Sequence, residues 1–489
     1  MEVRTDKPNV EKPNSPPKSA YVVLAGIFLA SFAVIYIALV LRVHFLTVKD
    51  GTEELSETAA NLIFAFALLT ILGAMYLYIA FSRKELMSRL KEPTAFMSVF
   101  TVVVTANIFI AYVNPYGMLI SLTALLVLPF SKRHDAFTLN VFASLISSFT
   151  LVDIVSNRFA VVSFTAISGV LSGAIGVYAF PTAMTRVKSV FRAFVTVLSA
   201  MAMYVVFLSV YSLSVEPLVD NFMYIGITAA GQMLLATFLE PIIESVFNVT
   251  TDFKLVELTS HKQPLIHRLI VEAPGTFNHS IAVANFAEIC ATAIGENPYF
   301  ARACAYYHDV GKLNNAMYFT ENQSGYNPHN DILPEVSAEI IRQHTVDGYN
   351  LCKEHRIPEE IARATIEHQG TLPITYFYNK AKSLTDGEVD MEEYRYHGDT
   401  PRGKVSAILM ICDSAEAAIR AMDNPDGEKV DRLLKAMIDE RLRLGQFDKC
   451  AITMQELNTI RAAIVGAYGG LYHKRIKYNT GAQKDDAHV

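Results

Sequence analysis

The stretch A-R-A-C-A-Y-Y-H-D-V-G-K, residues 301–312, places the adjacent polar pair His308 and Asp309 near the end of an apolar run. Around it, residues 273–478 carry apolar side chains at helical spacing, without the sustained alternation that would indicate strands. This segment is therefore predicted to form an all-α domain. Within it, residues 383–403 are polar and acidic, which is typical of a surface loop.

Histidines and aspartates recur on the apolar helical faces of this domain: His279, His308, Asp309, His344, His368 and Asp413. A buried carboxylate without a partner costs several kcal/mol or shifts its pKa to stay neutral. Asp413, in the apolar run A-I-L-M-I-C-D-S-A-E-A-A, therefore needs a cation or a strong donor. A single histidine on such a face is more often an ordinary core residue, but six such groups together favour a ligand site.

Imidazole and carboxylate groups on separate helices could meet in one cavity and bind divalent metal ions. This mixture of ligands suits Fe, Mn or Zn better than Ca or Mg. Consecutive helical side chains point about 100° apart, so His308 and Asp309 could face neighbouring ions, with Asp309 bridging them.

Other reactive residues of the C-terminal half have simpler interpretations. His329, His355 and His397 lie in polar surroundings and are expected at the surface. The five cysteines lack C-x-x-C spacing, which favours free thiols in a reducing compartment and core packing over disulfides or structural zinc; they are Cys290, Cys304, Cys352, Cys412 and Cys450.

The N-terminal half has a different composition. Residues 21–247 contain 12 basic and 12 acidic residues, whereas residues 248–489 contain 26 and 33. A helix needs about 17–25 mostly apolar residues to cross a bilayer. We predict a transmembrane domain over residues 21–247 with about eight such helices, or seven if the short fourth one is not separate; they lie near 21–41, 58–82, 96–113, 116–130, 137–156, 160–180, 189–213 and 221–240.

Loop charges predict the orientation of these spans. Alternate loops are basic, and lysine and arginine near helix ends stay in the cytoplasm. Eight spans with both termini in the cytoplasm fit this alternation. Residues 1–20 are then a cytosolic tail, residues 248–272 a helical connector interrupted by Pro264, and residues 479–489 a flexible tail.

The membrane half is more typical of an anchor or sensor than of a transporter, because its ionisable residues fall near span ends. The helix over residues 160–180 carries a small-residue face suited to close packing, formed by Gly169, Ser172, Gly173 and Gly176. The net charge of −6 argues against binding of polymeric nucleic acid.

The order of these histidines and aspartates resembles that of the HD-domain metal phosphohydrolases. Wider segments resemble the membrane-anchored, PgpH-type seven-transmembrane-receptor HD proteins: E-A-P-G-T-F-N-H-S, A-Y-Y-H-D-V-G-K, F-T-E-N-Q, N-P-H-N, I-E-H-Q-G-T and Y-F-Y-N-K-A. The resemblance extends from the spans to about Met422. It implies a cytosolic HD domain over residues 273–478, attached to a multi-pass bacterial plasma-membrane domain. It also implies hydrolysis of cyclic di-AMP to pApA at a site with two divalent ions, Fe or Mn.

Carried over by motif, the resemblance implies one metal held by His279, His308, Asp309 and Asp413, and another held by Asp309, His344 and His368. Asp309 would thus be catalytic. Lys312 is the candidate for a phosphate contact, although a solvated lysine at a helix end is an equal alternative. The resemblance also suggests Gly370, Thr371 and Tyr376 as residues lining the nucleotide pocket.

This sequence departs from the family in having only residues 42–57 between its first two spans, where the family usually has a large extracellular domain. It also lacks the Gly-Tyr-Pro triplet of the branch that cleaves cyclic di-GMP. Two alternatives stay open, an HD phosphohydrolase of ppGpp or cyclic di-GMP and a membrane receptor that only binds a nucleotide. The sequence also leaves open whether the chain forms a homodimer.

Overall fold

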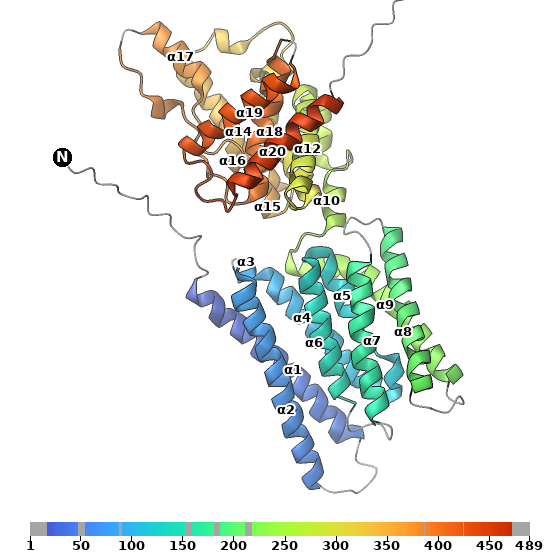
Figure 1. The fold of residues 1–489 in the computed structure, drawn as a ribbon. Helices are drawn as coiled ribbons and strands as arrows, with labels where there is room; N and C mark the ends of the chain where they lie inside the picture. The colour runs from blue at the N-terminus through green and yellow to red at the C-terminus, as the bar shows by residue number, and fades with distance from the viewer. Residues whose placement is uncertain are drawn as a thin grey trace, which may run out of the picture. The chain divides into compact units, whose positions relative to one another are not determined.

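The computed structural model describes residues 17–46, 54–87, 90–151, 158–179, 186–210, 218–385, 387–423 and 425–471 (Figure 1). Within these residues every regular element is a helix, and the β pairing is one isolated bridge between Pro373 and Arg395. The predicted all-α fold is therefore confirmed. The chain divides into two compact units, Met1–Lys254 and Leu255–Val489.

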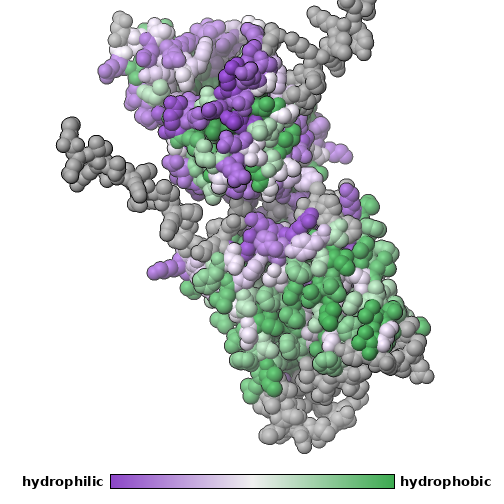
Figure 2. Space-filling view, in the orientation of Figure 1, coloured by the Kyte–Doolittle hydropathy of each residue, from purple (hydrophilic) through white to green (hydrophobic). Residues whose placement is uncertain are grey.

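The first unit is rich in long apolar helices. Six helices in its described part are long and apolar enough to cross a membrane: Lys18–Arg42, Asn61–Ser82, Lys91–Val113, Phe159–Tyr178, Val190–Val210 and Val219–Phe247. The elements of this unit are α1 (Lys18–Leu46), α2 (Glu54–Leu77), the π-helix η1 (Tyr78–Ser82), α3 (Lys84–Met87), α4 (Lys91–Val113), η2 (Pro115–Gly117), α5 (Leu122–Val127), η3 (Leu128–Phe130), α6 (Arg133–Phe149), α7 (Arg158–Tyr178), α8 (Arg186–Val210) and α9 (Leu218–Phe247). Hydrophobic residues cover much of its visible surface (Figure 2).

Two of the eight predicted spans are shorter in the structure. The segment 116–130 is an apolar region broken into η2, α5 and η3, and α6 has 17 residues. Part of the predicted span 137–156 lies outside the described residues, as do residues 1–16 and the predicted tail 479–489. The count of eight spans and their orientation therefore stay predictions.

Buried amide side chains stabilise the broken segment around α5. Asn107 of α4 accepts a hydrogen bond from Leu119 N at 2.7 Å, and Gln232 of α9 accepts one from Ser121 N at 3.1 Å. Asn140 of α6 accepts one from Ala124 N at 3.2 Å. Because backbone groups at helix ends lack intrahelical partners, these amides satisfy donors that lipid could not satisfy.

The small residues of α7 lie at close helix contacts, as predicted: Gly169 and Gly173 face α6, while Ser172 and Gly176 face α8. A Cβ atom on Gly169 would overlap Ser144, and a Cβ atom on Gly173 would overlap Asn140. Asn140 Nδ2 also donates to Gly169 O at 2.9 Å across this contact. Glycine at these two positions therefore leaves room for the Ser144 and Asn140 side chains of α6.

Helix α10 (Asp252–Leu258) joins the two units in sequence, and Pro264 begins α11 (Pro264–Glu272), as the predicted interruption requires. The second unit continues with α12 (Pro274–Ala293), α13 (Pro298–Tyr307), η4 (Val310–Tyr318), η5 (Thr320–Asn322), η6 (Pro328–Asn330), α14 (Pro334–Glu354), α15 (Glu359–Ala362), α16 (Ala364–Glu367), α17 (Thr375–Leu384), η7 (Met391–Tyr394), α18 (Lys404–Ala421), α19 (Gly427–Arg443) and α20 (Met454–Leu471). In Figure 2 hydrophilic residues are more frequent on this unit.

One hydrophobic core holds the second unit together. Helix α12 packs against α13, α18 and α20 around fully buried side chains such as Phe286, Tyr307 and Ile408. Four of the five free cysteines are buried, as expected for thiols that pack in the core, whereas Cys450 is half-buried. The predicted surface loop 383–403 is mostly exposed, but buried Tyr394 fixes it by donating to Glu335 Oε1 at 2.7 Å.

Candidate metal centre

The predicted ligands come from five helical segments of the second unit and meet in its interior. His279 lies in α12, His344 in α14 and Asp413 in α18, while His368 follows the last residue of α16. Helix α13 ends at Tyr307, so the chain turns at the two ligands that follow it before η4 begins. All six ligand residues are buried: His279, His308, Asp309, His344, His368 and Asp413.

The turn at this position depends on a glycine. A Cβ atom on Gly311 would overlap the carbonyl oxygen of His344, so only glycine lets η4 lie against α14 at this distance. The packing of these two elements brings the Asp309 and His344 side chains together.

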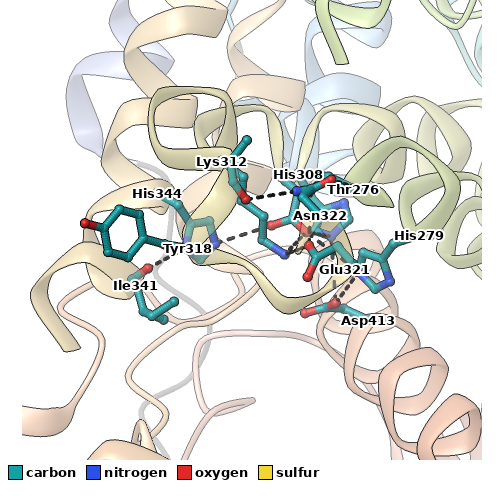
Figure 3. A network of polar contacts seen from close by, with 12 residues as sticks. Thr276, His279, His308, Lys312, Tyr318, Glu321, Asn322, Ile341, His344 and Asp413 are labelled. Carbon is teal, nitrogen blue, oxygen red and sulfur yellow. Dashed lines mark hydrogen bonds and ion pairs between the residues drawn. The ribbon is translucent and has the colours of Figure 1, made fainter. Parts of the chain in front are cut away.

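Four residues form the first ligand group: His279, His308, Asp309 and Asp413. His279 Nε2 lies 2.9 Å from Asp413 Oδ1 and 3.7 Å from Asp309 Oδ2. His308 Nε2 lies 3.1 Å from Asp309 Oδ2 and 3.7 Å from Asp413 Oδ1. Figure 3 shows His279, His308 and Asp413 directed toward one another.

The second ligand group consists of Asp309, His344 and His368. The two imidazole Nε2 atoms lie 3.3 Å apart, and they lie 3.4 Å and 3.7 Å from Asp309 Oδ1. Asp309 therefore presents Oδ2 to the first group and Oδ1 to the second. This is the arrangement expected of a carboxylate that bridges two neighbouring cations.

Each imidazole is oriented by a partner at its other nitrogen. The Nδ1 atoms of His308 and His344 lie 2.7 Å and 2.5 Å from the carbonyl oxygens of Ala305 and Ile341. His368 Nδ1 lies 2.9 Å from the Thr365 carbonyl oxygen. Because a carbonyl oxygen only accepts, Nδ1 must carry the proton in each case. The Nε2 lone pair is therefore directed into the ligand group once that nitrogen is unprotonated.

The two groups differ in their electrostatics. Burial alone would lower the pKa of His308, but the Asp309 and Asp413 carboxylates outweigh burial and raise that pKa to about 10. In the second group burial, reinforced by the positive charge of His308, lowers the pKa of His368 to about 3. Burial would raise the pKa values of the two aspartates, but the neighbouring cations hold both well below their usual range.

The donor set fits divalent metal ions. Ligand atoms bonded at about 2.1 Å to one ion lie about 3.0–3.4 Å apart at adjacent coordination positions, and the separations within the two groups are 2.9–3.7 Å. His308 Nε2 and Asp309 Oδ2 are buried and lie 3.1 Å apart, and the Lys312 ammonium group lies 2.7 Å from Asp309 Oδ2. Buried polar atoms are costly unless they are satisfied, and a cation between the imidazole and the carboxylate would satisfy both. The cluster can thus hold a metal ion.

Lys312 lies beside the shared carboxylate. Its Nζ atom is 2.7 Å from Asp309 Oδ2 and 2.8 Å from Glu321 Oε1, and its side chain is only 13% exposed. The alternative of a solvated lysine is therefore wrong. Burial would lower the pKa of this ammonium group, but the two carboxylates reverse that effect and raise it.

Glu321 belongs to F-T-E-N-Q, which docks on the start of α12. Thr276 Oγ1 donates to Glu321 Oε1 at 3.1 Å, and Asn322 Nδ2 donates to Thr276 Oγ1 at 2.8 Å. A Cβ atom on Gly275 would overlap the Glu321 carbonyl oxygen. The start of α12 therefore holds Glu321 in place, and Glu321 in turn holds Lys312 beside the ligand groups.

The predicted pocket residues lie beyond His368. Gly370 has φ +52°, a conformation that favours glycine. Thr371 is bonded to Gln446, whose Oε1 accepts from the Thr371 backbone at 3.0 Å and whose Nε2 donates to Oγ1 at 2.8 Å. The Tyr376 side chain is 67% exposed. Their contact with a substrate stays a prediction.

Sequence reasoning missed several residues around the site. His329 was expected at the surface but is 5% exposed, because its ring packs against Tyr318 and Phe377. Glu416 lies 2.5 Å from His279 Nδ1, and Gln369 Nε2 donates to Asp413 Oδ2 at 2.9 Å. The spacing of Glu416 three residues after Asp413 placed both on one helical face and was the available signal.

Comparison with known proteins identifies an HD domain in the second unit. The HD domain family model matches residues 276–418. The cyclic-di-AMP phosphodiesterase PgpH of Bacillus subtilis (strain 168) is 37% identical over 268 residues, which are 54% of this chain and 38% of the relative. PgpH of Listeria monocytogenes (serotype 1/2a, strain 10403S) is 41% identical over 249 residues, 51% of this chain and 34% of the relative. The chain thus spans just over a third of the length of these relatives.

A crystal structure of the L. monocytogenes PgpH HD domain in complex with cyclic-di-AMP matches 44% of this chain and all of that chain, with 42% identity and a TM-score of 0.42. The predicted resemblance to PgpH-type HD proteins is confirmed by the sequence matches. The second unit of this chain therefore contains an HD domain, which spans residues 276–418 and carries every residue of both ligand groups.

Proposed function

We propose that this protein is a membrane-tethered, metal-dependent phosphodiesterase that hydrolyses cyclic di-AMP to pApA. The observation that carries the proposal is the pair of ligand groups sharing Asp309, which directs one carboxylate oxygen into each. The similarity of this chain to two proteins named cyclic-di-AMP phosphodiesterase supports the choice of substrate.

The proposed cofactors are two divalent cations, iron or manganese. The first group offers two imidazoles and two carboxylates, and the second offers two imidazoles and the shared carboxylate. This mixture is intermediate in softness and suits first-row transition metals. Two such ions would supply a water of lowered pKa and neutralise the charge of the phosphodiester.

The chain's own residues position the reacting groups. Asp309 fixes the spacing of the two ligand groups because it belongs to both. Lys312, held by Glu321, presents an ammonium group beside Asp309, where it can contact a nonbridging phosphate oxygen. Gly370, Thr371 and Tyr376 are proposed to line the nucleotide pocket, with the exposed Tyr376 ring as a stacking surface for a base.

The first unit is proposed to anchor the enzyme in the plasma membrane. Its six long apolar helices support this role. Its buried amides bond to the backbone of the broken segment rather than forming an ionisable pathway, which favours an anchor or sensor over a transporter. Both termini are proposed to lie in the cytoplasm, where the second unit would reach a cytosolic nucleotide.

The test is a substrate panel with the purified full chain in detergent, loaded with Mn²⁺ or Fe²⁺. We expect conversion of cyclic di-AMP to pApA, slower turnover of cyclic di-GMP, and no comparable hydrolysis of ppGpp. Faster hydrolysis of ppGpp or cyclic di-GMP would contradict the proposed substrate. Binding of cyclic di-AMP without hydrolysis by the metal-loaded chain would instead indicate a receptor.

A further inference from the structure

One of the four ligand imidazoles has a different kind of outer partner. His308, His344 and His368 each bond through Nδ1 to a backbone carbonyl oxygen of their own helical segment. His279 Nδ1 instead lies 2.5 Å from the side-chain Oε2 atom of Glu416. A carboxylate is a stronger acceptor than a carbonyl group, so the proton on His279 Nδ1 is held more tightly.

Glu416 is itself buried and fixed. Its side chain is 1% exposed, and its second oxygen, Oε1, accepts a hydrogen bond from the Arg420 guanidinium group one helical turn later. The Arg420 side chain is 48% exposed, so the interior carboxylate is linked to a cation near the surface. This contact fixes the Glu416 side chain from the side opposite to His279.

Glu416 and Asp413 hold the His279 ring from opposite ends. Both carboxylates belong to α18, and their spacing of three residues directs them to the same helical face. Asp413 Oδ1 lies 2.9 Å from Nε2, while Glu416 Oε2 lies 2.5 Å from Nδ1. The contact of α12 with α18 thus fixes the ring plane and leaves Nε2 as the nitrogen that faces the first ligand group.

We propose that Glu416 is the positioning residue for the first ligand group, and that it orients His279 and increases its strength as a metal ligand. The inference rests on the proposed metal centre and adds a residue that is not itself a ligand. Loss of such an outer partner typically lowers metal affinity about 10–100-fold. The effect should be confined to the first group, because Glu416 contacts neither His344 nor His368 in the described hydrogen-bond network.

The test compares Glu416→Gln and Glu416→Ala with wild type, using Mn²⁺ titrations of the metal-free full chain in detergent. Glu416→Gln keeps an oxygen acceptor but removes the charge, whereas Glu416→Ala removes both. Glu367→Gln is a matched control, because Glu367 is a buried carboxylate that pairs with Arg363 rather than with an imidazole. Thermal unfolding of each metal-free variant monitors folding.

We expect one of the two Mn²⁺ ions to bind about 10–100-fold more weakly in Glu416→Gln and more weakly still in Glu416→Ala. The other ion and the Glu367→Gln control should keep wild-type affinity. Turnover of Glu416→Gln should recover at saturating Mn²⁺, a rescue that a purely structural defect would not allow.

Wild-type affinity for both ions in a folded Glu416→Ala variant would overturn the inference, as would equal weakening of both ions. If wild type binds two ions without hydrolysing cyclic di-AMP, the proposed substrate is wrong. A selective loss of affinity for one ion in the Glu416 variants would still support Glu416 as a positioning residue. Wild type that binds no metal would overturn both proposals.

Discussion

The two units both bury polar side chains, but they group them differently. The buried carboxylate of Asp135 in the first unit pairs with Arg83 at 3.0 Å, whereas the second unit gathers six ionisable ligand residues in one place. In the first unit the buried amides of Asn107, Asn140 and Gln232 bond to backbone groups of the broken segment. In the second unit the buried groups of the site are imidazoles and carboxylates that face one another in two ligand groups.

This difference separates a structural interior from a candidate catalytic one. A neutral amide that accepts a hydrogen bond from a buried backbone N–H removes the desolvation cost of that N–H, and it needs no further partner. Several ionisable groups buried together carry a large desolvation cost, and a cation can offset it. The clustering of imidazoles and carboxylates, rather than the burial of single ionisable groups, therefore favours metal binding in the second unit.

The largest expected effect follows from Asp309→Ala. Because Asp309 supplies an oxygen to each ligand group, its loss should sharply reduce the content of both metals. Hydrolysis of cyclic di-AMP should fall by at least about 1,000-fold, which corresponds to about 4 kcal/mol of lost transition-state stabilisation. Metal analysis and product chromatography measure both effects. Asp331→Ala, which changes an exposed aspartate, is the control. Normal turnover in Asp309→Ala would contradict the assignment of Asp309 as a ligand shared by both groups.

His344→Ala should affect one ion rather than two. His344 belongs only to the second group, so the first group keeps its four ligands. We expect the metal content to fall toward one ion per chain, whereas His279→Ala should deplete the other ion. Competition titrations with a chelator distinguish the two sites, and equal loss of both ions in His344→Ala would mean that the division of ligands is wrong.

Lys312→Ala should keep both ions and lose turnover. Its ammonium group is assigned to a phosphate oxygen, and one such interaction in the transition state is worth about 2.7–4 kcal/mol, or roughly 100–1,000-fold in rate. Steady-state kinetics at saturating metal measure the change. Lys353→Ala, at a lysine 52% exposed and paired with Glu359, should be silent. An unchanged rate in Lys312→Ala would limit Lys312 to its ion pairs with Asp309 and Glu321.

Asn140→Ala should have the smallest effect on chemistry. It leaves the Ala124 N–H and the Gly169 carbonyl oxygen without their partner, which should destabilise the first unit by about 1–3 kcal/mol. Metal content and turnover per folded molecule should stay at wild-type values. Thermal unfolding in detergent checks the first result, with Thr237→Ala as an exposed control. A loss of metal in Asn140→Ala would contradict the separation of roles between the units.

The sequence was most informative where a polar residue interrupts an apolar helical face. That pattern predicted the all-α fold and an inward-facing metal site from residues such as His279 and Asp413, and the resemblance supplied the division into two groups. His329 was misassigned because its local sequence is polar, and only the tertiary contact with Tyr318 and Phe377 buries it.

Contacts between distant segments could not be read from the sequence. The hydrogen bond that Leu119 N donates to Asn107 Oδ1 depends on the packing of a broken helix against its neighbours, which no periodicity encodes. The same holds for the two oxygens of Asp309, because their assignment to different ligand groups depends on the turn between α13 and η4. Tertiary packing determined these details.

The central claim is that the second unit builds the whole reaction centre by itself. A soluble fragment of residues 248–489 tests it most directly, because this region has its own hydrophobic core and contains both ligand groups. With Mn²⁺ or Fe²⁺ the fragment should bind two ions and convert cyclic di-AMP to pApA, with cyclic di-GMP turned over more slowly. A folded, metal-loaded fragment that is inert while the full chain in detergent is active would contradict the claim and would mean that the first unit helps to form the site.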